Sequence, residues 1–342
     1  DAFENIIFIG VKNASRNIEN LKSKEAFTQA ELKSVFGPGY AGKRNAVLFS
    51  AIDYKMDYLL FLDDDEYPVA VTNNKNVCLW SGQQVFLTHL REIEGVDYTN
   101  GYHCGYISPI PYVTFDDALC EKDFRTFIEA ISNDIINWES IKDLMETGGV
   151  TYASTEVLTR LTPRDVEWEN GCRFISGANL CINLKKPERS LPFFNPPGAR
   201  GEDTFLSTML KERTVRKVPC YAFHDGFSFY QHLLDGVLPI HLAPITSDSA
   251  FVATRFLNAC VGWVRYKPLL LYITRPDEFE QRARAIREAL VRTLPLLRGH
   301  FHEERFLSVL NEFEKYCRNV KKHYAQYITA QKTWKKIIEG ME

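Results

Sequence analysis

Residues 56–68 read MDYLLFLDDDEYP, a continuous apolar run that ends in three aspartates and a glutamate. The run is typical of a buried strand, and the acids with Pro68 indicate a loop at its end. Neighbouring carboxylates repel one another and are costly to desolvate, so their place directly after a strand needs a reason. Three uses remain open for them: a site for a divalent cation, acid–base or nucleophilic catalysis, and a solvated turn.

Strand and helix patterns alternate on both sides of this stretch. Residues 4–10 form an apolar run typical of a strand, and residues 17–36 have a helical composition. A loop at 37–42 precedes a helical pattern over 43–55, which leads into a strand over 56–62. This alternation predicts an α/β fold with a mixed, mainly parallel sheet flanked by helices. Ligands of such sheets bind beyond the carboxyl ends of the strands, where the acids lie.

The rest of the first 273 residues continues this pattern. Further strands are expected over residues 77–80, 98–110, 172–184 (on both sides of Gly177) and 215–225. Further helices are expected over residues 81–95, 121–147 and 204–213.

Composition excludes several classes of protein. The 342 residues carry a net charge of −3 with no long block of one sign, which argues against a broad nucleic-acid interface. The eight cysteines include no CxxC pair, so they favour neither a zinc knuckle nor a disulfide framework, and reduced thiols predict a cytoplasmic protein. No apolar run reaches the roughly 18 residues that suggest a membrane span.

Several motifs follow one another in an order that narrows the choice. They are Gly42-Lys43-Arg44-Asn45, Asp63-Asp64-Asp65, Ser176-Gly177-Ala178-Asn179, Gly201-Glu202-Asp203-Thr204 and His224. Together they resemble the nucleotide-sugar half of GT-A-fold glycosyltransferases of the family 2 type, across about 190 residues. By its spacing to Asp63, the run 4–10 matches the second strand of that fold. The family's first strand would then lie before residue 1, or this chain is built differently.

The resemblance assigns a role to each motif. Asp63, Asp65 and His224 would hold Mn²⁺ or Mg²⁺ against the donor diphosphate, and Asp203 or Glu202 would be the general base. The residues expected to contact the nucleotide sugar are Lys43, Arg44, Asn45, Asp63, Asp64, Gly177, Ala178 and Asn179.

The implied activity is a single, inverting transfer of a hexosyl group from a UDP- or GDP-sugar. The acceptor would be a hydroxyl of a saccharide or a lipid-linked molecule. Two other functions stay open: a sugar-nucleotide nucleotidyltransferase, and a non-catalytic module that binds nucleotide sugars.

Residues 274–342 are expected to form a helical extension of the catalytic domain, residues 1–273. Helical patterns begin near Pro276, with an interruption at Pro295 and Gly299. The last helix carries basic residues, namely Lys321, Lys322, Lys332, Lys335 and Lys336. Such a helix packs on the catalytic domain, packs on a second subunit of a homodimer, or contacts a membrane surface.

Overall fold

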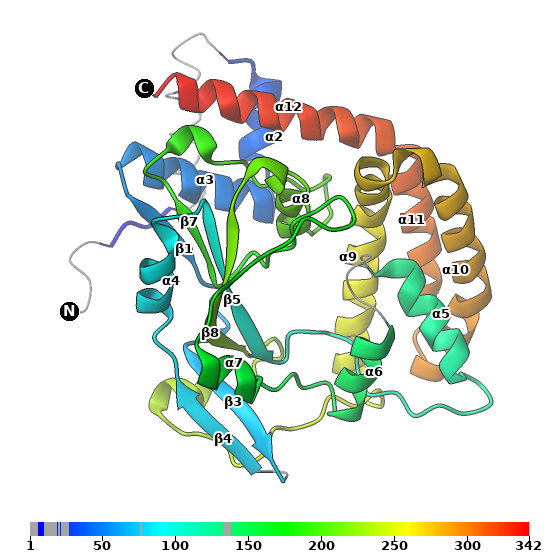
Figure 1. The fold of residues 1–342 in the computed structure, drawn as a ribbon. Helices are drawn as coiled ribbons and strands as arrows, with labels where there is room; N and C mark the ends of the chain where they lie inside the picture. Colours follow the sequence, from blue (N-terminus) through cyan, green and yellow to red (C-terminus); the bar gives the residue numbers. More distant parts are fainter. Residues whose placement is uncertain are drawn as a thin grey trace.

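A mixed β-sheet forms the centre of the computed structural model, which describes residues 6–9, 19, 21, 27–75, 77–132 and 138–341 (Figure 1). The strand order is β1-β7-β5-β8-β2, and β6 also pairs with β8. These strands are β1 (Tyr58–Phe61), β2 (Glu66–Tyr67), β5 (Tyr98–Gly105), β6 (Arg164–Asp165), β7 (Leu180–Asn183) and β8 (Val215–His224). Strands β1, β5 and β8 run in one direction, whereas β7 runs antiparallel between β1 and β5. A separate hairpin pairs β3 (Val69–Asn74) with β4 (Val77–Gly82).

Helices cover both faces of the sheet. On one face lie α2 (Gln29–Phe36), α3 (Tyr40–Asp53), α8 (Glu202–Ser207) and α12 (Val320–Glu339), and on the other lies α4 (Val85–Ile93) (Figure 1). Strand β7 shows why both faces need a cover, because successive side chains of a strand point to opposite faces. Leu180 and Ile182 join the core beneath α2 and α3, whereas Cys181 packs with Ile93 of α4.

A second hydrophobic core lies among helices beside the sheet. It is built by α5 (Glu121–Ile131), α6 (Trp138–Glu146), α9 (Ala250–Thr274), α10 (Phe279–Phe301) and α11 (Ser308–Arg318). The long helix α9 takes part in both cores, since Tyr266 and Leu269 pack toward the sheet and Phe256 packs toward α5 and α10. Further helices are α7 (Thr155–Arg160) and the short 3-10 turns Pro187–Arg189, Leu210–Glu212, Gln231–Asp235, Pro276–Glu278 and Glu304–Leu307.

The mixed α/β class and the C-terminal helical part agree with the sequence expectation. Helix α9 ends at Thr274, and the domain boundary expected after residue 273 stays a prediction. Among the described residues, none of the helices combines the length and the apolar character that crossing a lipid bilayer requires. Of the three expectations for the last helix, the structure shows packing on the sheet, because Trp334 of α12 is buried in the core beneath it.

Several expected elements were wrong in extent. Helix α3 begins at Tyr40, inside the expected loop 37–42. Of the strand expected over 172–184, only β7 forms, because the backbone of the preceding loop bonds to side chains instead of a neighbouring strand. Helix α10 continues through Pro295 and Gly299 without a break.

Another error concerns the N-terminal strand. Residues 6–9, the described part of the stretch 4–10, are not in a strand, and Ile6 and Phe8 are largely exposed. Residues 4, 5 and 10 lie outside the described residues. The expected match to the second strand of a GT-A fold therefore gains no support from this segment.

Candidate active site

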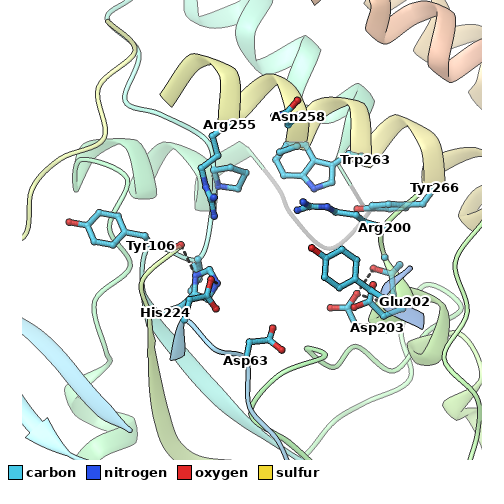
Figure 2. Close-up of a pocket in the computed structure, with 18 of the residues that line it drawn as sticks. Asp63, Tyr106, Arg200, Glu202, Asp203, His224, Arg255, Asn258, Trp263 and Tyr266 are labelled. Atoms are coloured by element: carbon cyan, nitrogen blue, oxygen red, sulfur yellow. Dashed lines mark hydrogen bonds and ion pairs between the residues drawn. The ribbon is translucent and has the colours of Figure 1, made fainter. Parts of the chain in front are cut away.

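A cavity of about 700 Å³ opens where the carboxyl ends of β1 and β8 meet α8 and α9 (Figure 2). One wall carries the acids that follow β1, together with His224 at the end of β8. The opposite wall is a face of α9. The residues that line the whole cavity are Tyr40, Arg44, Asp63, Asp64, Asp65, Tyr106, Ile107, Pro109, Phe174, Arg200, Gly201, Glu202, Asp203, Thr204, His224, Phe251, Thr254, Arg255, Asn258, Ala259, Gly262, Trp263 and Tyr266.

Arg44 connects three of the sequence motifs at the floor of this cavity. Its Nη2 lies 2.9 Å from Oδ1 of Asp63, and its Nε lies 3.3 Å from Oε1 of Glu202. Its Nη1 donates to the carbonyl oxygen of Gly177 over 2.6 Å. The planar guanidinium suits such convergent acceptors, so Arg44 holds the acids in place.

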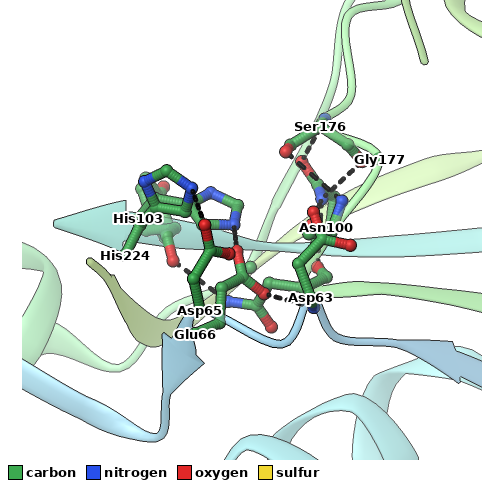
Figure 3. A network of polar contacts seen from close by, with 12 residues as sticks. Asp63, Asp65, Glu66, Asn100, His103, Ser176, Gly177 and His224 are labelled. Atoms are coloured by element: carbon green, nitrogen blue, oxygen red, sulfur yellow. Dashed lines mark hydrogen bonds and ion pairs between the residues drawn. The ribbon is translucent and has the colours of Figure 1, made fainter. Parts of the chain in front are cut away.

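Glu66 organises the acidic loop through two contacts (Figure 3). Oε2 of Glu66 accepts a hydrogen bond from the backbone N–H of Asp63 over 3.2 Å, and its Oε1 lies 2.7 Å from Nε2 of His103 on β5. Asp64 is exposed at the tip of the loop, although it lines the cavity. Glu66 therefore shapes the loop, and Asp63 is the acid of the loop that contacts Arg44.

Asp65 and His224 lie together at the cavity wall. Oδ2 of Asp65 lies 3.4 Å from Nε2 of His224, whose Nδ1 lies 2.7 Å from the carbonyl oxygen of Tyr106. A carbonyl oxygen accepts only, so Nδ1 carries a proton, and in a neutral ring Nε2 is then an acceptor. An imidazole lone pair would then face a carboxylate oxygen. Either a second proton on the ring or a cation between the two groups resolves this contact.

Electrostatics favours the proton when no cation is bound. Burial lowers the pKa of His224, but the hydrogen bond and the negative charge of Asp65 outweigh it, so this pKa lies above its ordinary value. The same hydrogen bond lowers the pKa of Asp65. Burial raises the pKa of the neighbouring Asp63, against the opposing charge of Arg44. The two aspartates are thus held in different environments.

Asp203 and Glu202 begin α8, after Gly201 takes a left-handed φ of 92°. Oδ2 of Asp203 accepts from the backbone N–H of Gly177 over 3.2 Å, and its Oδ1 accepts from the N–H of Thr204 over 2.7 Å. Glu202 is buried, and burial together with the charge of Asp203 raises its pKa. Glu202 forms an ion pair with Arg44. Asp203 forms no such pair among the described residues, so it is the better placed of the two acids to receive a proton from a ligand.

The loop that carries Gly177 is fixed from below by Asn100 of β5 (Figure 3). The backbone N–H of Ser176 donates to Oδ1 of Asn100 over 3.2 Å, and Nζ of Lys217 donates to the same oxygen over 2.9 Å. Burial lowers the pKa of Lys217 to about 8. Neither Asn100 nor Lys217 was expected from the sequence, because a buried residue that supports a loop carries no motif.

Asn179 and Ala178 lie behind the cavity, not in it. Oδ1 of Asn179 lies 2.9 Å from Nε2 of His89, and its Nδ2 donates to the carbonyl oxygen of Tyr102 over 3.0 Å. Both side chains are buried, and neither lines the cavity. Of the motif at residues 176–179, only the backbone of Gly177 takes part in the site, through Arg44 and Asp203.

Asn45 and Lys43 also lie away from the cavity. Asn45 is fully buried and its Nδ2 donates to the carbonyl oxygens of Val35 and Phe193, at 2.7 and 2.9 Å. Lys43 is exposed, with its Nζ 5.9 Å from the centre of the Tyr40 ring. The structure therefore gives Asn45 a supporting role and leaves Lys43 on the surface.

Sequence reasoning missed one whole wall of the site. Cavity residues recur along α9 at intervals of three or four, which places them on one face of the helix: Phe251, Thr254, Arg255, Asn258, Ala259, Gly262, Trp263 and Tyr266. Arg200, in the loop before α8, was missed as well. The periodicity of these residues was the signal that could have located this wall. It is weak, because most of the surface of α9 is apolar and its polar face is narrow.

Across the described ranges, no three His, Cys, Asp or Glu side chains stand close enough together to hold a metal ion. Only Asp65 and His224 of the expected ligands are adjacent, because Asp63 turns toward Arg44. Two protein ligands still suit Mg²⁺ or Mn²⁺, which commonly take their other ligands from phosphates and water. Comparison of the chain with known protein families, curated proteins and solved structures finds no match.

Proposed function

We propose that this chain is a metal-dependent glycosyltransferase of the GT-A type that uses a nucleotide-diphosphate sugar. One observation carries the proposal. Asp65 with His224, and Asp203 with Glu202, come from motifs far apart in the sequence and line the same cavity at the carboxyl edge of the sheet. In α/β sheets this edge is where ligands bind.

The acid loop has features that a solvated turn would not need. Three of its four carboxylates are engaged, since Asp63 pairs with Arg44, Asp65 with His224 and Glu66 with His103. Burying acids beside a cavity costs free energy, because their charges lose hydration. Carboxylates with shifted pKa values are common at functional sites, where they take part in binding or chemistry.

Asp65 and His224 would hold the cation, with diphosphate oxygens and water as its other ligands. When bound, the cation stabilises the charge that develops on the leaving diphosphate. Tyr106 supports this arrangement, because its carbonyl oxygen keeps the proton on Nδ1 of His224 and leaves Nε2 for a ligand bond.

Asp203 would be the general base. The acceptor hydroxyl forms a bond to the anomeric carbon and gives its proton to Asp203, while the bond from that carbon to the diphosphate breaks and its electron pair leaves with the phosphate. The backbone donors of Gly177 and Thr204 orient the carboxylate for this task. A direct displacement of this kind inverts the configuration of the sugar.

A thermal-shift panel tests the binding half of the proposal. Wild-type protein is heated with UDP-, GDP-, CMP- and dTDP-sugars, with and without Mn²⁺. We expect one nucleotide class to raise the midpoint, and to do so only with metal. The variant Asp65→Asn should lose this response, whereas Asp53→Asn, which alters an exposed acid at the end of α3, should keep it.

Other outcomes separate the alternatives. A nucleotidyltransferase would instead be stabilised by a nucleoside triphosphate and would release pyrophosphate. A binding module would respond to a nucleotide sugar but release no nucleoside diphosphate in any mixture. If no nucleotide sugar stabilises the protein even with metal, the proposal is wrong.

A further inference from the structure

Two arginines that are free of carboxylate partners converge on the cavity (Figure 2). Arg255 comes from α9 and Arg200 from the loop before α8, and both line the cavity. In the part of the chain that the structure describes, neither side chain forms an ion pair with an acid, whereas Arg44 pairs with two. The buried Nε of Arg255 also lacks a hydrogen-bond partner there.

The guanidinium groups are held by aromatic rings instead of by acids. The Cζ of Arg255 lies 4.7 Å from the centre of the Phe227 ring, and that of Arg200 lies 5.6 Å from the centre of the Tyr40 ring. Ring faces stabilise a cation but leave its N–H donors open. Burial lowers the pKa of Arg255 and the charge of Arg200 adds to this effect, against the opposing negative charges of Asp65 and Asp225. The two side chains therefore place two positive charges, and N–H groups that are open to a ligand, in the same cavity.

Four of the five acids that line the cavity are engaged elsewhere, and the fifth, Asp64, is exposed at the tip of the acidic loop and forms no ion pair with either arginine. Asp63 and Glu202 share Arg44, Asp65 pairs with His224, and Asp203 accepts from two backbone N–H groups. An incoming anion would neutralise the pair and accept their hydrogen bonds. Phosphate and carboxylate are the anions that suit a guanidinium fork.

We propose that Arg200 and Arg255 form a second anion subsite, which binds a phosphate or carboxylate group on the acceptor. The assignment to the acceptor rests on the proposed function. Arg200 lies three residues before Asp203, the group expected to touch the acceptor hydroxyl. Arg255 projects from α9, on the wall of the cavity opposite Asp63 (Figure 2).

Isothermal titration with inorganic phosphate tests the subsite without knowledge of the acceptor. Wild-type protein should bind phosphate, and Arg255→Gln and Arg200→Gln should each weaken binding about tenfold or more, as expected when a charged hydrogen-bond donor is lost. Arg284→Gln, which alters an exposed arginine on α10, is the matched control and should bind like wild type. Circular dichroism and thermal midpoints establish that each variant is folded.

A second titration identifies the source of the anion. It is repeated with saturating Mg²⁺ and UDP or GDP. If phosphate still binds with similar affinity, and the two variants still weaken it, the site is separate from the donor diphosphate and the proposal stands. Displacement of phosphate by the nucleotide would overturn it, because the arginines would then serve the donor.

The phosphate titration can support the anion subsite even if the proposed transferase function is wrong. Phosphate binding that requires both arginines supports an anion subsite even if no nucleotide sugar binds, although its ligand would then not be a glycosyl acceptor. Phosphate that does not bind, or that binds equally to the folded variants, overturns the subsite and leaves the proposed transferase untouched.

Discussion

Arg44 shows how a single side chain can set the geometry of a site. Its Cζ lies 5.1 Å from the centre of the Phe61 ring and 5.7 Å from that of Phe193, so the guanidinium is held by aromatic rings while its N–H groups reach Asp63 and Glu202. Such a side chain is rigid and permanently charged. It joins Asp63 and Glu202 next to Asp65 and Asp203, the two acids proposed above as a cation ligand and as the base.

Replacing Arg44 with glutamine should destabilise the protein. The change leaves Asp63 and Glu202 without their shared cation, and breaking a mostly buried pair in this way costs roughly 2–4 kcal/mol, less than for a fully buried pair because Asp63 is partly solvated. Urea unfolding measures the loss. Arg125→Gln removes an exposed pair with Glu129 and should cost less than about 0.5 kcal/mol. Equal effects of the two changes would contradict the role given to Arg44.

Glu202 makes the stability of the protein depend on pH. Its pKa is raised in the folded state above the ordinary value of 4.5, so the folded protein binds this proton more tightly than the unfolded chain does. Its contribution to the free energy of unfolding is therefore present at low pH and is lost as pH rises through the folded pKa. Glu202→Gln should remove this decline.

The measurement is urea unfolding of wild type and Glu202→Gln at several pH values from about 4.5 upward. As pH rises, the wild type should lose unfolding free energy relative to the Glu202→Gln variant. Glu167→Gln, at an exposed glutamate outside the cavity, serves as the control. A difference that stays constant with pH, or that moves the other way, would show that the environment of Glu202 has been misread.

At this scale the sequence located some site residues and misplaced others. Asp63, Asp65, Asp203 and His224 do line one cavity, because residues that follow strands or begin helices meet at the sheet edge. Asn45 and Asn179 do not, because a motif fixes position in the chain but not which way a side chain points. Both amides bond to backbone groups that only the folded chain brings near.

At the scale of elements, the start of α3 was harder to predict than its existence. Glycines at 37–42 suggested a loop, yet α3 already includes Gly42. An added Cβ at Gly42 would lie 1.8 Å from the carbonyl oxygen of Gly37, so the glycine is required by close packing and not by a turn. Sequence alone does not distinguish these two uses of glycine.

Gly42→Ala should therefore lower stability, although alanine is the better helix former. Overpacking of this kind costs about 1–3 kcal/mol. Gly299→Ala, in α10, is a matched control because its added Cβ meets nothing within 4 Å, and it should gain up to about 1 kcal/mol. Thermal or urea unfolding gives both values. A neutral or stabilising Gly42→Ala would mean that the contact with Gly37 is looser than described.

At the scale of the whole molecule, the C-terminal helices belong to the same folded unit as the sheet. The Trp334 side chain of α12 is 1% exposed and its Nε1 donates to Oγ of Ser190 over 3.1 Å. The α/β class and the helical extension were predictable from local patterns. Contacts such as this one, between residues 144 apart in the sequence, were not, because no local pattern encodes them.

Replacing Trp334 with alanine tests whether α12 unfolds together with the sheet. Trp334→Ala should cost about 3–5 kcal/mol, the range for removing a large buried aromatic side chain. It should also lower the midpoint of the entire unfolding transition, monitored by circular dichroism. Lys335→Ala, on the exposed side of the same helix, should change stability by no more than about 0.5 kcal/mol. If Trp334→Ala behaves like Lys335→Ala, then α12 is a detachable appendage.

The central claim concerns a reaction, and release of nucleoside diphosphate from a nucleotide sugar tests it most directly. Wild-type protein is incubated with the donor panel and a mixture of saccharide and lipid-linked acceptors, with Mn²⁺ or with a chelator. We predict release that requires metal and falls by about 10²–10⁴-fold in Asp203→Asn, while that variant still binds the donor. Release that is unaffected by Asp203→Asn, or its absence from every mixture that contains metal, would contradict the account.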